Sequence, residues 1–278
     1  MKFETADTRY GVMSYPQYDA VLGPSLKLYG EWAQDEINGL ANLIKNGDVV
    51  IDAGANIGTH ALGFADAVAP LGCVYAFEPQ PSIYELLQRN CSMNAKAANV
   101  VTYCNPLSDV GGVQYRLPVF DEDRIQNFGA AQLSFVGDGD GDVQAAHSDS
   151  SMTIDELNLD TCRLIKLDVE GMELAVLNGA TNLINKCQPL IFFEANTIPL
   201  AWEIIQKFTL STKYSSRVVV CDVFSIQNFN QNKLNIFSDY QETSILLYPE
   251  EEEESVAGAF KNSIHVSNLT ELTIALAF

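Results

Sequence analysis

A glycine-containing segment, residues 52–59, carries the clearest chemical signal in the sequence. It reads Asp-Ala-Gly-Ala-Asn-Ile-Gly-Thr and follows a short apolar run. Glycines let a backbone turn sharply and approach a ligand closely, and ligands of open α/β sheets bind beyond the carboxyl ends of the strands. Glu78 lies about 20 residues further on, after a second apolar run, where an acidic side chain can accept hydrogen bonds from both ribose hydroxyls of a nucleoside. Together, the two signals predict a nucleoside-binding site.

The spacing of the glycines indicates which nucleoside is bound. A dinucleotide-binding fingerprint has the form GxGxxG, in which the middle glycine lets a pyrophosphate approach the backbone. Here Asn56 stands between Gly54 and Gly58 in a GxxxG pattern. The carboxylates of Asp52 and Glu78 would repel a diphosphate and attract a cation. These residues favour S-adenosylmethionine, which carries a sulfonium and an ammonium group and no phosphate. An NAD-dependent oxidoreductase is the weaker alternative.

A second group of acidic residues follows two later apolar runs. Asp168 and Glu170 come after one run, and Glu194 ends the next. Because parallel strands end at the same edge of a sheet, we expect these carboxylates near the ligand of the glycine segment. A carboxylate or a histidine within hydrogen-bonding distance can take the proton of a hydroxyl that is being methylated. We rank the candidate bases in the order Asp168, Glu170, Glu194 and His60. Helix capping competes as an interpretation of the carboxylates, and packing competes for His60.

A metal-assisted reaction is a further alternative. Asp168, Glu194 and Asn196 offer oxygen atoms of the kind that Mg²⁺ or Ca²⁺ prefers, and a bound ion could orient a diol acceptor. We do not favour a divalent metal and assign no metal ligand. The six cysteines are scattered without a CxxC pair, and the three histidines are far apart. This distribution argues against a zinc site and against a disulfide framework.

Strand-like and helical segments alternate from residue 48 onward. Short, continuous apolar runs interleaved with helices are typical of a parallel sheet that is buried on both faces. Right-handed crossovers then give an α/β fold with a doubly wound, mostly parallel sheet. The predicted strands cover residues 48–52, 73–77, 99–104, 163–168 and 189–194. The predicted helices cover residues 58–68, 81–94, a stretch ending at residue 183, and residues 199–208.

Three parts of the chain lie outside this alternation. The first 47 residues are predicted to hold one helix, near residues 31–44. A segment rich in Gly, Asp and Ser interrupts the repeat between the third and fourth strands and is predicted to face the substrate. Strand-like runs at residues 217–224 and 243–248 fit the far edge of the sheet. The predicted organisation is an N-terminal extension (1–47), a main domain (48–250) with an insertion (110–152), and a tail packed on the domain (251–278).

The composition excludes some partners. The 278 residues include 16 Lys and Arg against 36 Asp and Glu, a formal charge of −20. A nucleic acid or an anionic membrane surface would require positive charge, so neither is an expected partner. No apolar run approaches the roughly 20 residues of a membrane span, and the first residues lack the apolar core of a secretory signal. We expect a cytoplasmic protein that acts on a small-molecule or glycan acceptor, and the oligomeric state stays open.

The motifs resemble those of FkbM-type methyltransferases, a family of S-adenosylmethionine-dependent O-methyltransferases. The most specific stretch is LIKLDVEGMELAVLNGA, residues 164–180. Further matches are VIDAGANIGTH at 50–60, FEP at 77–79, YGEW at 29–32 and NFGA at 127–130. The resemblance implies a seven-stranded class I methyltransferase (Rossmann-like) sheet with one antiparallel strand near its C-terminal edge. It also implies methyl transfer to a hydroxyl of a sugar, glycan or secondary metabolite. A binding module that kept the fold and lost turnover is the alternative.

The resemblance also implies roles for individual positions. The turn at residues 105–107 would lie against the adenine, and Asp168 would lie beside the methionine part of the cofactor. Residues 29–32 would close over the cofactor. The predicted cofactor contacts are Asp52, Gly54, Ala55, Asn56, Gly58, Thr59, Glu78, Pro79, Asn105, Leu107 and Asp168. The predicted acceptor contacts are Asn127, Phe128 and Gly129.

Overall fold

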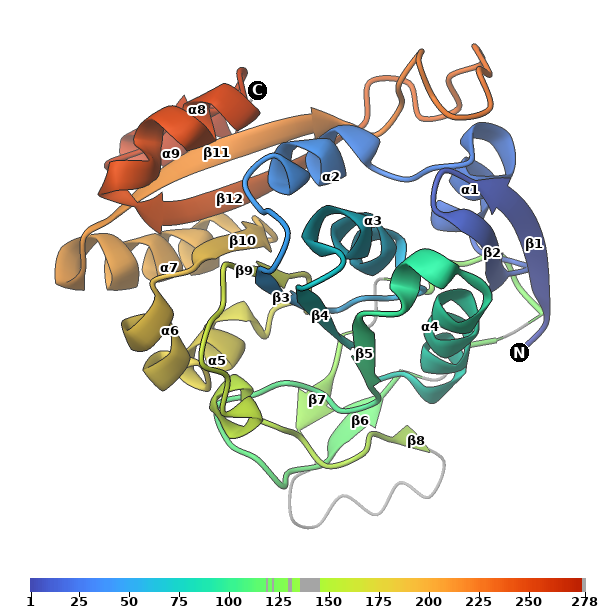
Figure 1. Ribbon diagram of the computed structural model, residues 1–278, viewed down its shortest axis with the longest axis horizontal. Coiled ribbons are helices and arrows are strands. Elements are labelled where there is room, and N and C mark those ends of the chain that lie inside the picture. The colour runs from blue at the N-terminus through green and yellow to red at the C-terminus, as the bar shows by residue number, and fades with distance from the viewer. Residues whose placement is uncertain (119, 122, 130–131, 136–145, 277–278) are drawn as a thin grey trace.

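A computed structural model describes residues 1–118, 120–121, 123–129, 132–135 and 146–276 of the chain (Figure 1). Part of the expected insertion at residues 110–152 therefore lies outside the described residues. Helices cover both faces of one central sheet in Figure 1, and most neighbouring strands in this sheet are parallel. The predicted α/β, doubly wound architecture is confirmed.

The central sheet has eight strands in the order β13-β11-β12-β10-β9-β3-β4-β5. Their bounds are β3 (Val49–Ala53), β4 (Cys73–Phe77), β5 (Val100–Tyr103), β9 (Leu164–Leu167), β10 (Leu190–Glu194), β11 (Tyr214–Asp222), β12 (Gln241–Pro249) and β13 (Ile264–His265). Strand β12 runs antiparallel to both β10 and β11, so it is the expected antiparallel strand near the C-terminal edge. The two-residue strand β13 adds an eighth strand to the seven that were expected.

Alternate residues of each strand belong to different hydrophobic cores. Val50 packs in the core under α2 (Gln34–Ala41), α3 (Thr59–Val68), α4 (Pro81–Met93) and α8 (Glu253–Ala259). Ile51 packs in the core on the opposite face, under α5 (Glu173–Asn178), α6 (Thr181–Cys187), α7 (Ile198–Ser211) and α9 (Leu269–Ala275). Successive side chains of a strand point to opposite faces. Burial on both faces therefore explains why these strands read as continuous apolar runs.

The N-terminal segment holds more structure than the single helix that we expected near residues 31–44. It forms a hairpin of β1 (Phe3–Thr8) and β2 (Gly11–Pro16), followed by α1 (Leu22–Tyr29) and α2. The hairpin packs beside α4, and the Asn90 side chain accepts from the amide of Ser14 at 2.7 Å and donates to its carbonyl at 2.9 Å. These contacts join residues more than seventy positions apart, so local periodicity could not reveal them.

A small second sheet lies between β5 and β9 in the chain. It has the order β7-β6-β8, with β6 (Tyr115–Leu117), β7 (Ser134–Phe135) and β8 (Ala146–His147). Short 3₁₀ turns occupy Ala95–Ala97, Ile154–Leu157 and Glu250–Glu252. A backbone bridge between Asp19 and Gln126 ties this region to the N-terminal segment. Residues 127–129 follow that bridge directly, which brings them to the carboxyl edge of the central sheet.

Candidate active site

The chain turns sharply where β3 ends, and Gly54 makes the turn. Gly54 has a φ of 78°, in the left-handed region that favours glycine. A Cβ atom on Gly54 would lie 1.8 Å from the carbonyl oxygen of Asp168, so a larger residue would displace the loop after β9. The amides of Gly54 and Ala55 both donate to the carbonyl of Phe77, at 2.9 and 2.8 Å. The ends of β3, β4 and β9 are thereby held together.

Glu78 follows β4 and is buried at this edge of the sheet. Its carboxylate accepts from the amide of Gln80 at 2.8 Å and from the amide of Asn56 at 3.1 Å. Burial raises the pKa of Glu78 to about 7, and the charges of Asp168 and Asp52 add to this rise, while the two amide hydrogen bonds oppose it. The Asn56 contact links the acidic residue directly to the glycine loop.

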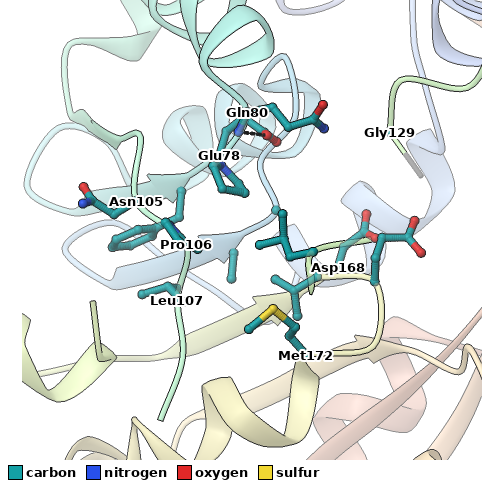
Figure 2. A pocket seen from close by; sticks show the side chains of 15 residues that line it. Glu78, Gln80, Asn105, Pro106, Leu107, Gly129, Asp168 and Met172 are labelled. Atoms are coloured by element: carbon teal, nitrogen blue, oxygen red, sulfur yellow. Dashed lines mark hydrogen bonds between the residues drawn. The ribbon is translucent and has the colours of Figure 1, made fainter. Parts of the chain in front are cut away.

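A cavity opens beside Glu78, and we call it the first cavity (Figure 2). Glu78, Gln80 and Asn105 contribute polar groups to its lining, and Leu107 and Met172 contribute apolar ones. Figure 2 shows these side chains arranged around a shared opening, with Asp168 at its border. A nucleoside needs carboxylate oxygens for its ribose hydroxyls and an apolar slot for its base. The first cavity offers both.

A larger cavity adjoins the first, and we call it the second cavity. Its volume is about 520 Å³. The two cavities share Gly54, Glu78, Gly129, Asp168 and Glu170 as lining residues. The carboxyl ends of β9 and β10, helix α2 and the connection between β11 and β12 enclose the second cavity. Any group bound across the shared border would therefore reach both cavities.

Three carboxylates meet at that border. Asp168, Glu170 and Glu194 each offer an oxygen within 4.8 Å of the others. Burial, together with the charge of Asp168, raises the pKa of Glu170 to about 7 and that of Glu194 to about 8. Such groups can accept a proton near neutral pH. The three oxygens could also hold a cation, and the side-chain nitrogen of Asn196, the third residue of the metal alternative, donates to Glu173 at 3.3 Å.

A buried lysine lies beneath this acidic edge. Lys166 is 4% exposed, and its Nζ lies 3.2 Å from Asp168 Oδ2 and 3.5 Å from Asp52 Oδ1. Burial alone would lower the pKa of Lys166, but Asp168 and Asp52 outweigh burial and raise it. Asp52, Lys166 and Phe192 are register partners on β3, β9 and β10, so they form one row across the sheet. Lys166 therefore neutralises part of the negative charge of Asp52 and Asp168, which we had expected the cationic cofactor to neutralise.

A comparison with known protein families identifies the family to which this chain belongs. A model of the methyltransferase FkbM domain matches residues 52–215, more than half of the chain. The chain belongs to the FkbM methyltransferase domain family. Residues 52–215 therefore form a methyltransferase FkbM domain, a type of domain that takes S-adenosylmethionine as its cofactor. The matched range includes the glycine loop, Glu78 and all three border carboxylates.

Two curated relatives are similar to part of the chain. Hexuronic acid methyltransferase AglP of Haloferax volcanii is 30% identical over 160 residues, which cover 54% of this chain and 57% of AglP. Methyltransferase sdnD of Sordaria araneosa is 28% identical over 179 residues, which cover 55% of this chain and 67% of sdnD. This chain thus spans little more than half the length of AglP. None of the described helices is long and apolar enough to cross a membrane.

One solved FkbM-type structure is similar in outline. Methyltransferase FkbM from Methylobacillus flagellatus is 16% identical, with a TM-score of 0.46. The match covers 74% of this chain and 44% of that one. At this low identity, the similarity assigns no role to individual residues of this chain.

The FkbM-type site fits its cofactor by two features of its own. The Gly54 backbone approaches the carbonyl of Asp168 so closely that a Cβ atom would not fit, and this contact brings the ends of β3 and β9 together at the edge of the first cavity. The buried Glu78 carboxylate accepts from two backbone amides and also lines the first cavity. It could accept hydrogen bonds from ribose hydroxyls there. Gly54, Glu78, Pro79, Asn105 and Leu107 would hold the nucleoside there.

The structure gathers most, but not all, of the predicted site residues. Those that line a cavity are Gly54, Asn56, Glu78, Pro79, Asn105, Leu107, Asn127, Gly129, Asp168, Glu170 and Glu194. Those that are buried and line neither cavity are Asp52, Ala55, Gly58, Thr59 and Phe128. Phe128 packs against Phe120, with ring centroids 5.1 Å apart. Asp52 has both oxygens buried without a hydrogen bond among the described residues, and its nearest cation is Lys166.

Several residues of the second cavity were absent from our predicted site. They are Glu36, Lys166, Phe237, Tyr240 and Glu242. A lysine within an apolar strand was a detectable signal for Lys166, since a charge there must find buried partners. His60, our fourth candidate base, lines the cavity, and its Nε2 lies 2.8 Å from Glu36 Oε1. The remaining residues come from distant segments, and no local pattern marked them.

Proposed function

We propose that this chain transfers a methyl group from S-adenosylmethionine to a hydroxyl of a sugar, glycan or secondary metabolite. The observation that carries the proposal is the shared border of the two cavities. The nucleoside part of the cofactor suits the first cavity, and an acceptor suits the second. Asp168 and Glu170 stand between them, with Glu194 beside them. The acceptor hydroxyl would meet its base and the methyl donor at one place.

The chain's own residues account for the proton. Bound S-adenosylmethionine supplies a methyl carbon on a positive sulfur, which keeps the electron pair when the carbon–sulfur bond breaks. The acceptor oxygen forms the new bond to carbon, and its proton passes to a carboxylate at the border and then to water. The raised pKa values of Glu170 and Glu194 suit them to accept that proton near neutral pH. The cavities would hold both reactants in contact and exclude competing water.

Two observations support a sugar or another polyol as the acceptor. AglP, which is 30% identical over part of the chain, is named for hexuronic acid. The second cavity is also lined by carboxylates, which accept hydrogen bonds from hydroxyls, and by the aromatic rings of Trp32, Phe237 and Tyr240. Family membership argues against the NAD-dependent alternative. The cytoplasmic location that we expected stays a prediction.

Binding of S-adenosylhomocysteine tests the proposal. We expect the parent protein to bind it in calorimetry, and Glu78→Gln to weaken binding by about 1–3 kcal/mol because two amides and the ribose lose a charged partner. The matched control is Glu85→Gln, an exposed carboxylate of α4, which should leave affinity unchanged. Binding of NAD in place of S-adenosylhomocysteine would contradict the proposal.

Methyl transfer itself requires a second measurement. The protein is incubated with S-adenosylmethionine and a panel of hydroxylated sugars, and mass spectrometry detects methylated products. We expect a methyl group on oxygen. Cofactor binding without any methylated product across the panel would support the non-catalytic alternative instead.

A further inference from the structure

The second cavity has more negative than positive charge. Its ionisable lining residues include the acids Glu36, Asp168, Glu170, Glu194 and Glu242, against Lys166 and His60. Lys166 already contacts Asp52 and Asp168, and His60 already pairs with Glu36. S-adenosylmethionine would bring two positive groups and one negative group to the shared border. Glu194 and Glu242 form no direct ion pair among the described residues, and Lys166, which partly offsets their charge, is already paired with Asp52 and Asp168.

The sheet directs three of the polar side chains to one place. Glu194 of β10 lies directly opposite Ser244 of β12, and Glu242 lies two residues before Ser244. Opposite residues of an antiparallel pair share a face, and so do residues two apart in a strand. All three line the second cavity. They therefore form one polar patch on its floor, beyond the border with the first cavity.

Both acidic members of this patch have a raised pKa. Burial, with the charges of Asp168 and Glu242, raises the pKa of Glu194 to about 8. Burial, with the charges of Glu36 and Asp168, raises the pKa of Glu242 to about 7. Carboxylates shift in this direction where desolvation and like charges outweigh nearby cations. A positive group in the cavity would relieve both effects.

Ser244 gives an independent indication of a ligand. It is 4% exposed and lines the cavity. Its hydroxyl has no hydrogen-bond partner among the described residues. The oxygen is open to the cavity and can both donate and accept a hydrogen bond there. A polar group on the acceptor would supply the missing partner.

Aromatic side chains line the same cavity as this patch. Trp32 and Phe237 lie edge to face, with centroids 5.8 Å apart, and Tyr240 lines the cavity beside Glu242. Aromatic rings attract ammonium groups through their negative faces. Carboxylates, an unpaired hydroxyl and aromatic rings together make a receptor for an organic cation.

We propose that the acceptor carries a protonated amine, as an amino sugar does, and that Glu194, Glu242 and Ser244 bind this amine while a hydroxyl of the same molecule is methylated. This inference rests on the proposed function. An acceptor with a carboxylate, like the hexuronic acid in the name of AglP, would meet like charges in this cavity. The acceptor would thus differ in charge from that relative's.

The test compares p-nitrophenyl β-glucoside with three glycosides that each differ from it at one carbon: the glucosaminide and the N-acetylglucosaminide at C2, and the glucuronide at C6. Binding to the protein loaded with S-adenosylhomocysteine is measured by calorimetry. We expect the glucosaminide to bind about tenfold more tightly than the two neutral glycosides and the glucuronide to bind most weakly. In Glu242→Gln, the advantage of the glucosaminide should fall about fivefold or more. The control Glu203→Gln, an exposed carboxylate of α7, should keep it.

The outcomes separate this inference from the proposed function. Equal binding of the four glycosides, or tighter binding of the glucuronide, by a protein that binds S-adenosylhomocysteine overturns the amine site alone. Absence of S-adenosylhomocysteine binding overturns the proposed function. The ranking of the four glycosides on the parent protein needs no variant, so it decides the question even if Glu242→Gln fails to fold.

Discussion

At the scale of single residues, Lys166 is the charge on which the acidic edge depends. Asp52 is fully buried, and Asp168 is half-buried, and both lie against the same ammonium group. A buried charge that loses its partner is costly, whereas removing both partners is often nearly neutral. The lysine therefore serves to make the close approach of Asp52 and Asp168 tolerable.

Replacing Lys166 should show how much the buried carboxylate of Asp52 destabilises the fold when it has no cation beside it. We expect Lys166→Met to lower the free energy of unfolding by about 3–5 kcal/mol, since Asp52 would be left buried without a cation. Urea unfolding measures the loss. The double variant Asp52→Asn/Lys166→Met should recover most of it. A single variant as stable as the parent would show that the ion pair is not needed.

The raised carboxyl pKa values predict how stability changes with pH. Burial raises the pKa of Glu78, Glu170 and Glu242 to about 7 and that of Glu194 to about 8. Between the unfolded and folded pKa values the folded state binds more protons, so these groups contribute stability that is lost as the pH rises. We expect the free energy of unfolding to fall between about pH 5 and about pH 8.

A single substitution tests whether this pH dependence of stability arises from the carboxyl groups of the candidate active site. Glu194→Gln removes one of the shifted carboxyls and should flatten the pH dependence of urea unfolding. Glu203→Gln, an exposed change on α7, serves as the control and should keep the parent slope. Stability that rises with pH over this range in the parent protein would refute the assignment.

At the scale of elements, the site is assembled from strand ends and from two segments that close over them. The connection between β11 and β12 is tied to the N-terminal region, because the Tyr29 hydroxyl donates to the carbonyl of Leu234 at 2.7 Å and accepts from the amide of Ile236 at 2.9 Å. The amide of Phe229 donates to Glu31 at 2.9 Å. These contacts position Trp32 and Phe237 at the second cavity.

The turn after β3 provides a prediction about an element. Gly54→Ala would put a methyl group against the carbonyl of Asp168, and we expect at least about tenfold weaker binding of S-adenosylhomocysteine. Gly112→Ala is the matched control, since Gly112 also has a positive φ, of 84°, but among the described residues other than its chain neighbours no atom lies within 4 Å of the added carbon. Both variants bear the left-handed backbone cost of about 1–2 kcal/mol. Equal effects on cofactor binding would contradict the close-contact explanation.

At the scale of the whole molecule, the formal charge of −20 sets the response to salt. Like charges repel across a compact molecule, and salt screens that repulsion. We expect the melting temperature to rise between about 0.05 M and about 1 M NaCl at neutral pH. Near the isoelectric point of about 4.3 the net charge is small, so the rise should largely vanish. A salt response of the same size at both pH values would show that charge repulsion is not its cause.

The sequence by itself determined where the strands end and which acidic residues stand at those ends. Asp52, Glu78, Asp168 and Glu194 each follow or end a short apolar run, and parallel strands bring such ends to one edge of a sheet. Apolar runs of this kind arise because both faces of each strand are buried, which is a local property of the chain. The fold class and the nucleoside side of the site could therefore be predicted.

Only the tertiary structure decided which of those groups face a ligand and which groups join them. Asp52 ends a strand as predicted, yet its row in the sheet places it against Lys166 and away from both cavities. Glu36 and Glu242 reach the second cavity from segments about two hundred positions apart. Periodicity and motif spacing report on neighbours along the chain. Contacts between distant segments depend on packing, and packing is settled only when the whole sheet and its covering helices come together.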